Sequence, residues 1–205
     1  MLVGRAAWSI QVDGADRVPT TGPVVLAANH LGVMDGPLVH TMAPRPPRIL
    51  VKSEMFRGLL GAILRSAGQI PVDRASSRSG LEAARGVLRA GGVVGIFPEG
   101  NRGRGDGASV RAGVAWLAVQ GGAPVVPVAV LGTRHTGEPT GHVPGFRRRL
   151  VVEFGEPIAP VSAASARESV RLTADAVAAA LVAHVSESAV RHGVELPVDG
   201  PTPVV

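Results

Sequence analysis

A chain of 205 residues with a formal net charge of +5 has the size of one domain and enough length for a substantial core. Aromatic residues make up only 3% and tyrosine is absent, which excludes the stacking platforms that nucleic-acid bases need. The absence of cysteine excludes disulfides and thiolate metal sites. We therefore expect an aliphatic core, no nucleic-acid partner, no metal and no other cofactor.

Short apolar runs alternate with helical segments along the chain. In order, we expect strand 8–12, strand 24–28, helix 38–42, strand 49–51, helix 54–66, strand 69–72, helix 80–90, strand 93–97, helix 109–120, strand 124–131, strand 150–154 and helix 165–188. This alternation predicts an α/β fold, a single domain with a largely parallel central sheet flanked by helices. We place the domain at residues 1–192 and expect a flexible C-terminal tail over residues 193–205.

Positive charge is concentrated in one part of the chain. Residues 45–74 contain six basic and two acidic side chains, so this stretch carries +4 of the net charge. Such a stretch favours anionic partners, either phosphates or anionic lipid. No window reaches the roughly 18 uninterrupted apolar residues of a membrane span. We therefore expect a cytoplasmic protein that is peripheral on the inner face of the cell membrane.

The expected helix 54–66 has a broad apolar stripe with Arg57 and Arg65 beside it. A stripe of this kind is typical of a helix that packs against the core, which is the interpretation we favour. The alternative is a helix that lies on an anionic membrane and admits acyl chains. Residues 147–149 are three consecutive arginines, and we interpret them as a solvated run of charge rather than a headgroup site.

His30 and Asp35 directly follow the expected strand 24–28 and are separated by four residues. Residues five positions apart in a helix point about 140° away from each other, so this pair can meet only if the chain turns first. Gly32 permits such a turn. A carboxylate on one imidazole nitrogen would leave the other nitrogen ready to accept a proton. The alternative is that Asp35 only caps the helix and His30 is a hydrogen-bonded loop residue.

Residues 97–102 form the second motif, where the apolar strand 93–97 ends. Gly100 lets a ligand approach the backbone, and Arg102 can hold a phosphate with two hydrogen bonds. Glu99 would brace Arg102 or meet a substrate hydroxyl; the alternative for the whole motif is a salt-bridged turn. Because ligands collect at the carboxyl ends of parallel strands, we expect both motifs at the same edge of the sheet.

These motifs resemble the glycerolipid acyltransferases of the lysophosphatidic acid acyltransferase type (1-acylglycerol-3-phosphate O-acyltransferases). His30 and Asp35 match the His-x4-Asp motif of that family, and residues 97–102 match a later block. Residues 52–54 and 68–74 together resemble the second block of the family, and residues 126–130 resemble the fourth. Several blocks in order are far more specific than any one of them. The resemblance covers residues 8–154 and implies an acyltransferase-like fold.

The resemblance also implies roles for individual residues. His30 is implied as the catalytic base and Asp35 as the residue that orients it. Acceptor binding is implied for Lys52, Arg74, Glu99, Gly100 and Arg102.

The implied activity moves a fatty acyl group from acyl-CoA or acyl carrier protein to the 2-hydroxyl of 1-acylglycerol 3-phosphate. Phosphatidate would be the product, as in phospholipid biosynthesis, and the implied partners are the acyl donor, a lysophospholipid acceptor and a membrane surface. Gly32, Asn101 and Gly103 depart from the usual family residues on the acceptor side. Three alternatives stay open: another lysophospholipid or glycolipid acceptor, a thioester hydrolase, and a non-catalytic lipid-binding protein.

Overall fold

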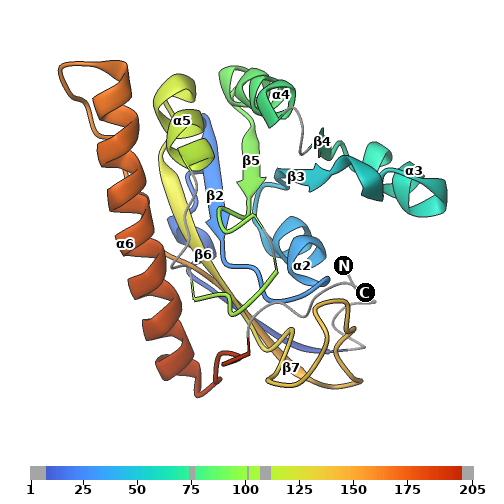
Figure 1. Cartoon of the computed structure of the whole chain (residues 1–205). Helices are drawn as coiled ribbons and strands as arrows, with labels where there is room; N and C mark the ends of the chain where they lie inside the picture. Colours follow the sequence, from blue (N-terminus) through green and yellow to red (C-terminus); the bar gives the residue numbers. More distant parts are fainter. Residues whose placement is uncertain (1–7, 74–76, 101, 107–111, 200–205) are drawn as a thin grey trace.

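The computed structural model describes residues 8–73, 77–100, 102–106 and 112–199 (Figure 1). In these residues the strands are β1 (Ser9–Asp13), β2 (Val24–Ala28), β3 (Arg48–Lys52), β4 (Ile70–Val72), β5 (Val93–Ile96), β6 (Val125–Leu131) and β7 (Arg149–Phe154). The helices are α2 (Asp35–Met42), α3 (Gly58–Ser66), α4 (Ser77–Arg89), α5 (Ala112–Gly121) and α6 (Ala166–His192), with 3-10 turns η1 (Ala15–Arg17) and η2 (Ser53–Met55). The predicted strands are confirmed, with bounds shifted by a residue or two.

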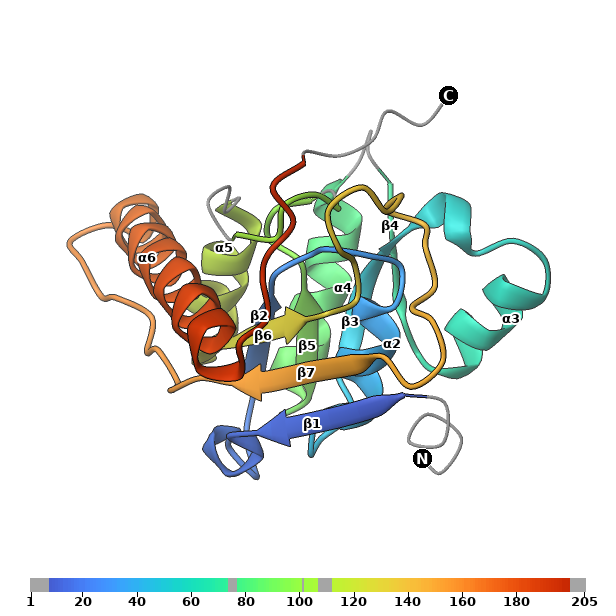
Figure 2. The ribbon, with the colours of Figure 1, turned by 90° about the horizontal axis from the view of Figure 1, so that it is seen from below.

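The strands form one sheet in the order β1-β7-β6-β2-β5-β3-β4. Neighbouring strands from β6 to β4 pair in parallel, whereas β7 pairs antiparallel with β6, and β1 runs parallel to β7. Figure 2 shows β7 and β1 side by side at one edge of the sheet. The largely parallel sheet is therefore confirmed, and the carboxyl ends of β6, β2, β5, β3 and β4 meet at one edge.

Both faces of the central strand β2 are buried, as its uninterrupted apolar sequence predicts. Val24, Leu26 and Ala28 pack on the face that α2 covers. Val25 and Ala27 point the other way and pack with residues of α4 and α5. Helix α6 extends that second layer over β6 and β7. The molecule is thus a single α/β domain in which helices cover both faces of the sheet.

Helix α6 is, within the described residues, the helix that is long and apolar enough to cross a membrane by length and composition. Its residues Val177, Leu181 and Val185 are completely buried against the sheet and α5, so this apolar face is occupied by the protein's own core. The Ser165 side chain accepts a hydrogen bond from the Glu168 backbone and begins the helix. Helix α6 is accordingly a covering helix of the fold.

The end of α6 is fastened to β7 through the buried Glu153 carboxylate. His192 Nε2 lies 2.9 Å from Glu153 Oε2, and the Arg191 guanidinium donates to the other carboxylate oxygen. Burial alone would raise the pKa of Glu153, but the His192 hydrogen bond and the Arg191 charge hold it below its ordinary value. The carboxylate therefore stays ionised and keeps both α6 partners in place.

The segment 54–66 differs from the expectation in two respects. It is split into η2 and α3 rather than one helix, and α3 projects from the edge of the sheet beyond β3 and β4 (Figure 1). Leu59, Leu60 and Ile63 have exposed fractions of 79%, 46% and 54%. The prediction that this stripe packs in the core is therefore wrong, because no element of the described structure covers that side of α3.

The chain after α6 runs back across the loop that joins β6 to β7. The Asp199 carboxylate accepts hydrogen bonds from Arg134 Nη1 at 3.0 Å and from the Gly137 backbone at 3.1 Å. The Val198 backbone donates to Thr136 Oγ1 at 3.2 Å. Hydrogen bonds thus tie residues 193–199 of the expected tail to the domain, and residues 200–205 lie outside the described part of the chain.

Candidate active site

His30 lies just beyond the end of β2 and meets Asp35 as the turn hypothesis requires. His30 Nδ1 and Asp35 Oδ2 are 2.8 Å apart. The same carboxylate oxygen accepts backbone hydrogen bonds from Leu31 at 2.7 Å and Gly32 at 2.8 Å, which closes the turn before α2 begins. Asp35 therefore closes the turn ahead of α2 and contacts the imidazole at the same time, whereas no side chain caps the helix, so the alternative of a simple helix cap is wrong.

The second oxygen of the Asp35 carboxylate is also occupied. Asp35 is completely buried, and its Oδ1 accepts a hydrogen bond of 2.5 Å from Thr133 Oγ1. Thr133 follows β6, the strand beside β2, and the sequence analysis missed it. Its position directly after an apolar strand was the one available signal. With Asp35 fixed on both oxygens, its carboxylate favours the His30 tautomer in which Nδ1–H donates to it.

The His30 ring is held on its face as well as at its edge. The ring stacks on Phe97, with centroids 4.1 Å apart and planes inclined by 21°. The His30 side chain retains an exposed fraction of 15%. Among the described residues, no hydrogen bond to Nε2 is found, which leaves this nitrogen available to a substrate.

The second motif lies against the first, as predicted. The His30 backbone N–H donates to Glu99 Oε1 at 3.3 Å, and the Gly103 N–H donates to the His30 carbonyl at 2.9 Å. Glu99 is buried in this contact. Gly100 has a φ of +73°, and its N–H bonds the Phe97 carbonyl in the turn that ends β5. The two motifs therefore form one continuous site.

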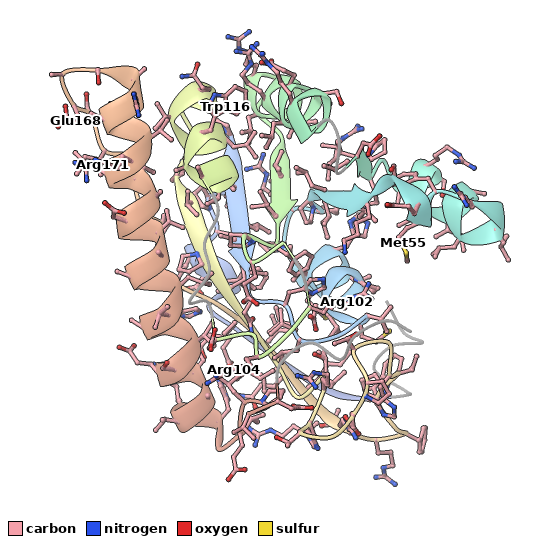
Figure 3. All side chains as sticks on the ribbon, viewed as in Figure 1. Met55, Arg102, Arg104, Trp116, Glu168 and Arg171 are labelled. Carbon is pink, nitrogen blue, oxygen red and sulfur yellow. The ribbon has the colours of Figure 1, made fainter. Side chains whose placement is uncertain are left out.

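Arg102 contributes the positive charge of the site. Its Nε atom is buried and has no hydrogen-bond partner among the described residues, although the side chain as a whole is half-buried. Figure 3 shows Arg102 beside α2, below the carboxyl end of β5. A buried guanidinium N–H without a partner is a donor that an anionic ligand would satisfy.

Two of the predicted acceptor-binding residues remain, Lys52 and Arg74. Lys52 ends β3, which lies beside β5, so it is exposed at the same edge of the sheet. Arg74 lies outside the described residues.

The surface hollow of about 600 Å³ between α3, β4 and α4 includes neither His30 nor Arg102. In the described part of the chain no three His, Asp or Glu side chains gather to hold a metal ion.

Two buried polar side chains that the sequence analysis missed hold the loop after Arg102. Asn29 donates to the Gly105 carbonyl at 2.9 Å and exchanges hydrogen bonds with the Val130 backbone. Arg134 is completely buried, and its Nη2 donates to the Gly103 carbonyl at 3.0 Å. Both residues follow central strands, and both fix the backbone that presents Arg102. The site thus combines a positioned imidazole with a guanidinium on a supported loop.

Known proteins match the chain over the same region. A family model described as Acyltransferase matches residues 9–131, which is more than half of the chain. A 1-acyl-sn-glycerol-3-phosphate acyltransferase of Borreliella burgdorferi is 35% identical over 137 residues, covering 63% of this chain and 54% of that protein. A protein of the same name from Bacillus subtilis is 28% identical over 155 residues, covering 73% of each chain.

A solved structure matches the fold. The crystal structure of the 1-acyl-sn-glycerophosphate (LPA) acyltransferase PlsC from Thermotoga maritima has a TM-score of 0.67 and 24% sequence identity, and the match covers 87% of this chain and 71% of that one. This likeness concerns the arrangement of the sheet and its helices. The chain spans about half the length of the Borreliella burgdorferi relative.

Proposed function

The chain belongs to the acyltransferase family, and from that membership we propose that it acylates the 2-hydroxyl of 1-acylglycerol 3-phosphate. The acyl donor in this proposal is a thioester of CoA or of acyl carrier protein, and the product is phosphatidate. The proposal rests on one observation. His30 and Asp35 are in contact at 2.8 Å, and backbone hydrogen bonds join His30 to Glu99 and Gly103, which lie on either side of Arg102 in the chain. A base beside a cation suits a hydroxyl on a phosphorylated molecule.

The proposed reaction uses the two nitrogens of His30 differently. Nε2 takes the proton of the acceptor hydroxyl as the oxygen attacks the thioester carbonyl carbon, and Asp35 stabilises the imidazolium that forms. The new bond between the acceptor oxygen and the acyl carbon is kept, and the C–S bond of the thioester breaks. The thiolate of the donor leaves and takes the proton back from His30. Base and carboxylate return to their starting state, so every atom and charge is accounted for.

Acceptor binding is assigned to basic side chains of the site and of the strongly basic segment 45–74. Arg102 offers its guanidinium to the phosphate, and Lys52 and Arg74 are proposed as further phosphate contacts. Glu99 and Gly100 shape the turn on which the acceptor lies. We place the reaction on the cytoplasmic face of the cell membrane, since both acceptor and product are lipids and residues 45–74 are strongly basic.

The experiment that tests the proposal supplies purified protein with labelled acyl donor and a panel of acceptors. We expect labelled phosphatidate from 1-acylglycerol 3-phosphate. Faster labelling of another lysophospholipid or a glycolipid would transfer the proposal to that acceptor. Labelled fatty acid released without acceptor would indicate a thioester hydrolase, and vesicle binding without turnover would indicate a lipid-binding protein.

A matched pair of arginines tests phosphate recognition on the same loop. Arg102→Ala should raise KM for phosphate-bearing acceptors about tenfold or more, because a charged hydrogen-bond donor is removed. Arg104→Ala is the control, because its side chain is 60% exposed and pairs only loosely with Asp106 at 3.4 Å (Figure 3). An equal effect of Arg102→Ala on a phosphate-free acceptor would contradict the assignment.

A further inference from the structure

Helix α3 presents an apolar face that no described part of the chain covers. Leu59 and Ile63 are four residues apart and Leu60 and Ile63 three apart, so their side chains share one side of the helix. All three are strongly exposed. Gly61 faces the other way, where a Cβ would lie 2.3 Å from the Phe56 backbone carbon. The close approach at Gly61 therefore fixes α3 with its leucine and isoleucine side chains outward.

A second exposed apolar group lies on the loop between β6 and β7. Val143 and Phe146 have exposed fractions of 55% and 77%. Figures 1 and 2 show this loop and α3 on the same side of the molecule, opposite α6. In the view of Figure 3, Arg102 lies between the two. The two apolar groups therefore lie on the side of the molecule opposite α6.

Positive charge accompanies both apolar groups. Arg57 directly precedes α3, Arg65 lies in its last turn, and Arg147 follows Phe146; all three are exposed. Apolar side chains bordered by arginines match the boundary of an anionic bilayer, where acyl chains lie beneath phosphate headgroups. A protein partner is less suited to two separate, small apolar groups than one continuous apolar patch would be.

We propose that α3 and the loop tip 143–147 dock this chain on an anionic lipid surface. Leu59, Leu60, Ile63 and Phe146 enter the headgroup layer, and the arginines contact lipid phosphates. In this orientation the acceptor is supplied to Arg102 and His30 from the lipid surface on which the chain is docked. The route for the acceptor rests on the proposed function, whereas the docking surface itself can be tested without turnover.

Flotation with phosphatidylcholine vesicles, with and without phosphatidylglycerol, tests the docking surface. We expect binding to the anionic vesicles, weakened about tenfold by Leu59→Ser with Ile63→Ser and also by Phe146→Ser. Val190→Ser is the matched control, because Val190 is 83% exposed on α6, on the opposite side of the molecule. Unchanged vesicle affinity in both the α3 and the Phe146 variants would overturn the proposal.

A second pair of variants tests the charge. Arg57→Gln and Arg147→Gln should each weaken binding to anionic vesicles about fivefold, and Arg167→Gln on α6 should not. Equal effects of the three variants would remove the assigned role of the arginines. If Leu59→Ser instead converts a lipid-free dimer into a monomer, the apolar face of α3 is a contact with a second copy of the chain, and the proposal fails.

Activity measurements separate this inference from the proposed function. Docking variants should keep wild-type rates with a short-chain acceptor dissolved in water and lose rate only with a long-chain acceptor in vesicles. Loss of both rates in a folded variant would contradict a pure docking role. If the wild-type protein shows no transfer at all, the vesicle experiments still decide the docking surface while the proposed function fails on its own.

Discussion

The Asp35 carboxylate accepts more hydrogen bonds than any other group described at the site. It receives the backbone N–H groups of Leu31 and Gly32, the hydroxyl of Thr133 and the imidazole of His30. A buried carboxylate is stable only when its oxygens are satisfied in this way. The same bonds that stabilise the turn also fix the angle of the imidazole, so structure and chemistry depend on one side chain.

We expect Thr133 to affect the acyl-transfer rate only through its hydrogen bond to Asp35. Thr133→Val removes the hydroxyl and keeps the shape, so we expect kcat to fall about tenfold as Asp35 loses one of its holding bonds. Thr133→Ser keeps the hydroxyl and should restore most of the rate. The measurement is the steady-state acyl-transfer rate of the three proteins. Equal rates in the valine and serine variants would show that the hydroxyl has no positioning role.

At this scale the sequence predicted part of the site. The His-x4-Asp spacing and Gly32 showed only that His30 and Asp35 could meet, and it was the second motif with the family resemblance that favoured their pairing. Thr133 and Arg134 could not be predicted, since their contacts with the site depend on β6 lying beside β2, a pairing of strands about a hundred residues apart. Buried polar residues after central strands are the signal to examine in such chains.

Among the elements, the loop 102–106 depends on a glycine. Gly105 has a φ of +63°, and a Cβ there would lie 2.3 Å from Leu31 Cδ2, a side chain that is itself buried. Gly105→Ala should therefore lower the free energy of unfolding by about 2 kcal/mol and reduce activity, because Leu31 cannot yield without disturbing the turn to Asp35. Urea unfolding and the transfer rate measure the two effects.

Gly122→Ala is the control for Gly105→Ala. Gly122 also has a positive φ, +58°, but no atom lies within 4 Å of the added Cβ. The Gly122→Ala protein should lose only about 1 kcal/mol of unfolding free energy, from backbone strain, and keep full activity. If Gly105→Ala were no worse than Gly122→Ala in both measurements, the close packing of the loop on Leu31 would not matter.

The loop between β6 and β7 is held by an ion pair. Arg148 donates two hydrogen bonds to Glu138, at 2.5 and 2.7 Å, and these are the main reason that the pKa of Glu138 falls from 4.5 to about 2. Because the folded pKa lies below the unfolded one, Glu138 stabilises the fold above pH 4.5, and this contribution is lost as the pH falls toward 2.

Glu138→Gln should therefore flatten the acid side of the stability profile. We expect the urea midpoint of the variant to depend less on pH than that of wild type between about pH 4.5 and 2, since the variant has no carboxylate to protonate. Glu82→Gln, which breaks a surface pair on α4, serves as the control and should leave the profile unchanged. A wild-type slope in the Glu138 variant would contradict the assignment.

Helix α3 shows what periodicity can and cannot predict. The apolar repeat in residues 54–66 correctly indicated helix, but it carried no information on what covers the apolar side. The turn at η2 and the positive φ of Gly58, +56°, direct α3 away from the sheet, where no described element meets it. Burial is a property of the neighbours, and the neighbours are set by tertiary structure.

For the whole molecule, the order of the strands creates the site. The chain passes from β2 to β3 and β4 and returns to place β5 between β2 and β3. This return brings Phe97 and Glu99 beside His30, although about seventy residues separate them. The alternation of strands and helices predicted the parallel sheet and its functional edge, whereas the order of strands within the sheet lay beyond sequence patterns.

The central claim is that His30 acts as the base that Asp35 orients. Its most direct test is the acyl-transfer rate of His30→Ala alongside its thermal unfolding, because His30 is partly exposed and, unlike Asp35, does not hold the turn together. We predict a rate about a thousandfold below wild type with an unfolding temperature close to that of wild type. A folded His30→Ala protein that transfers acyl groups at nearly the wild-type rate would contradict the claim.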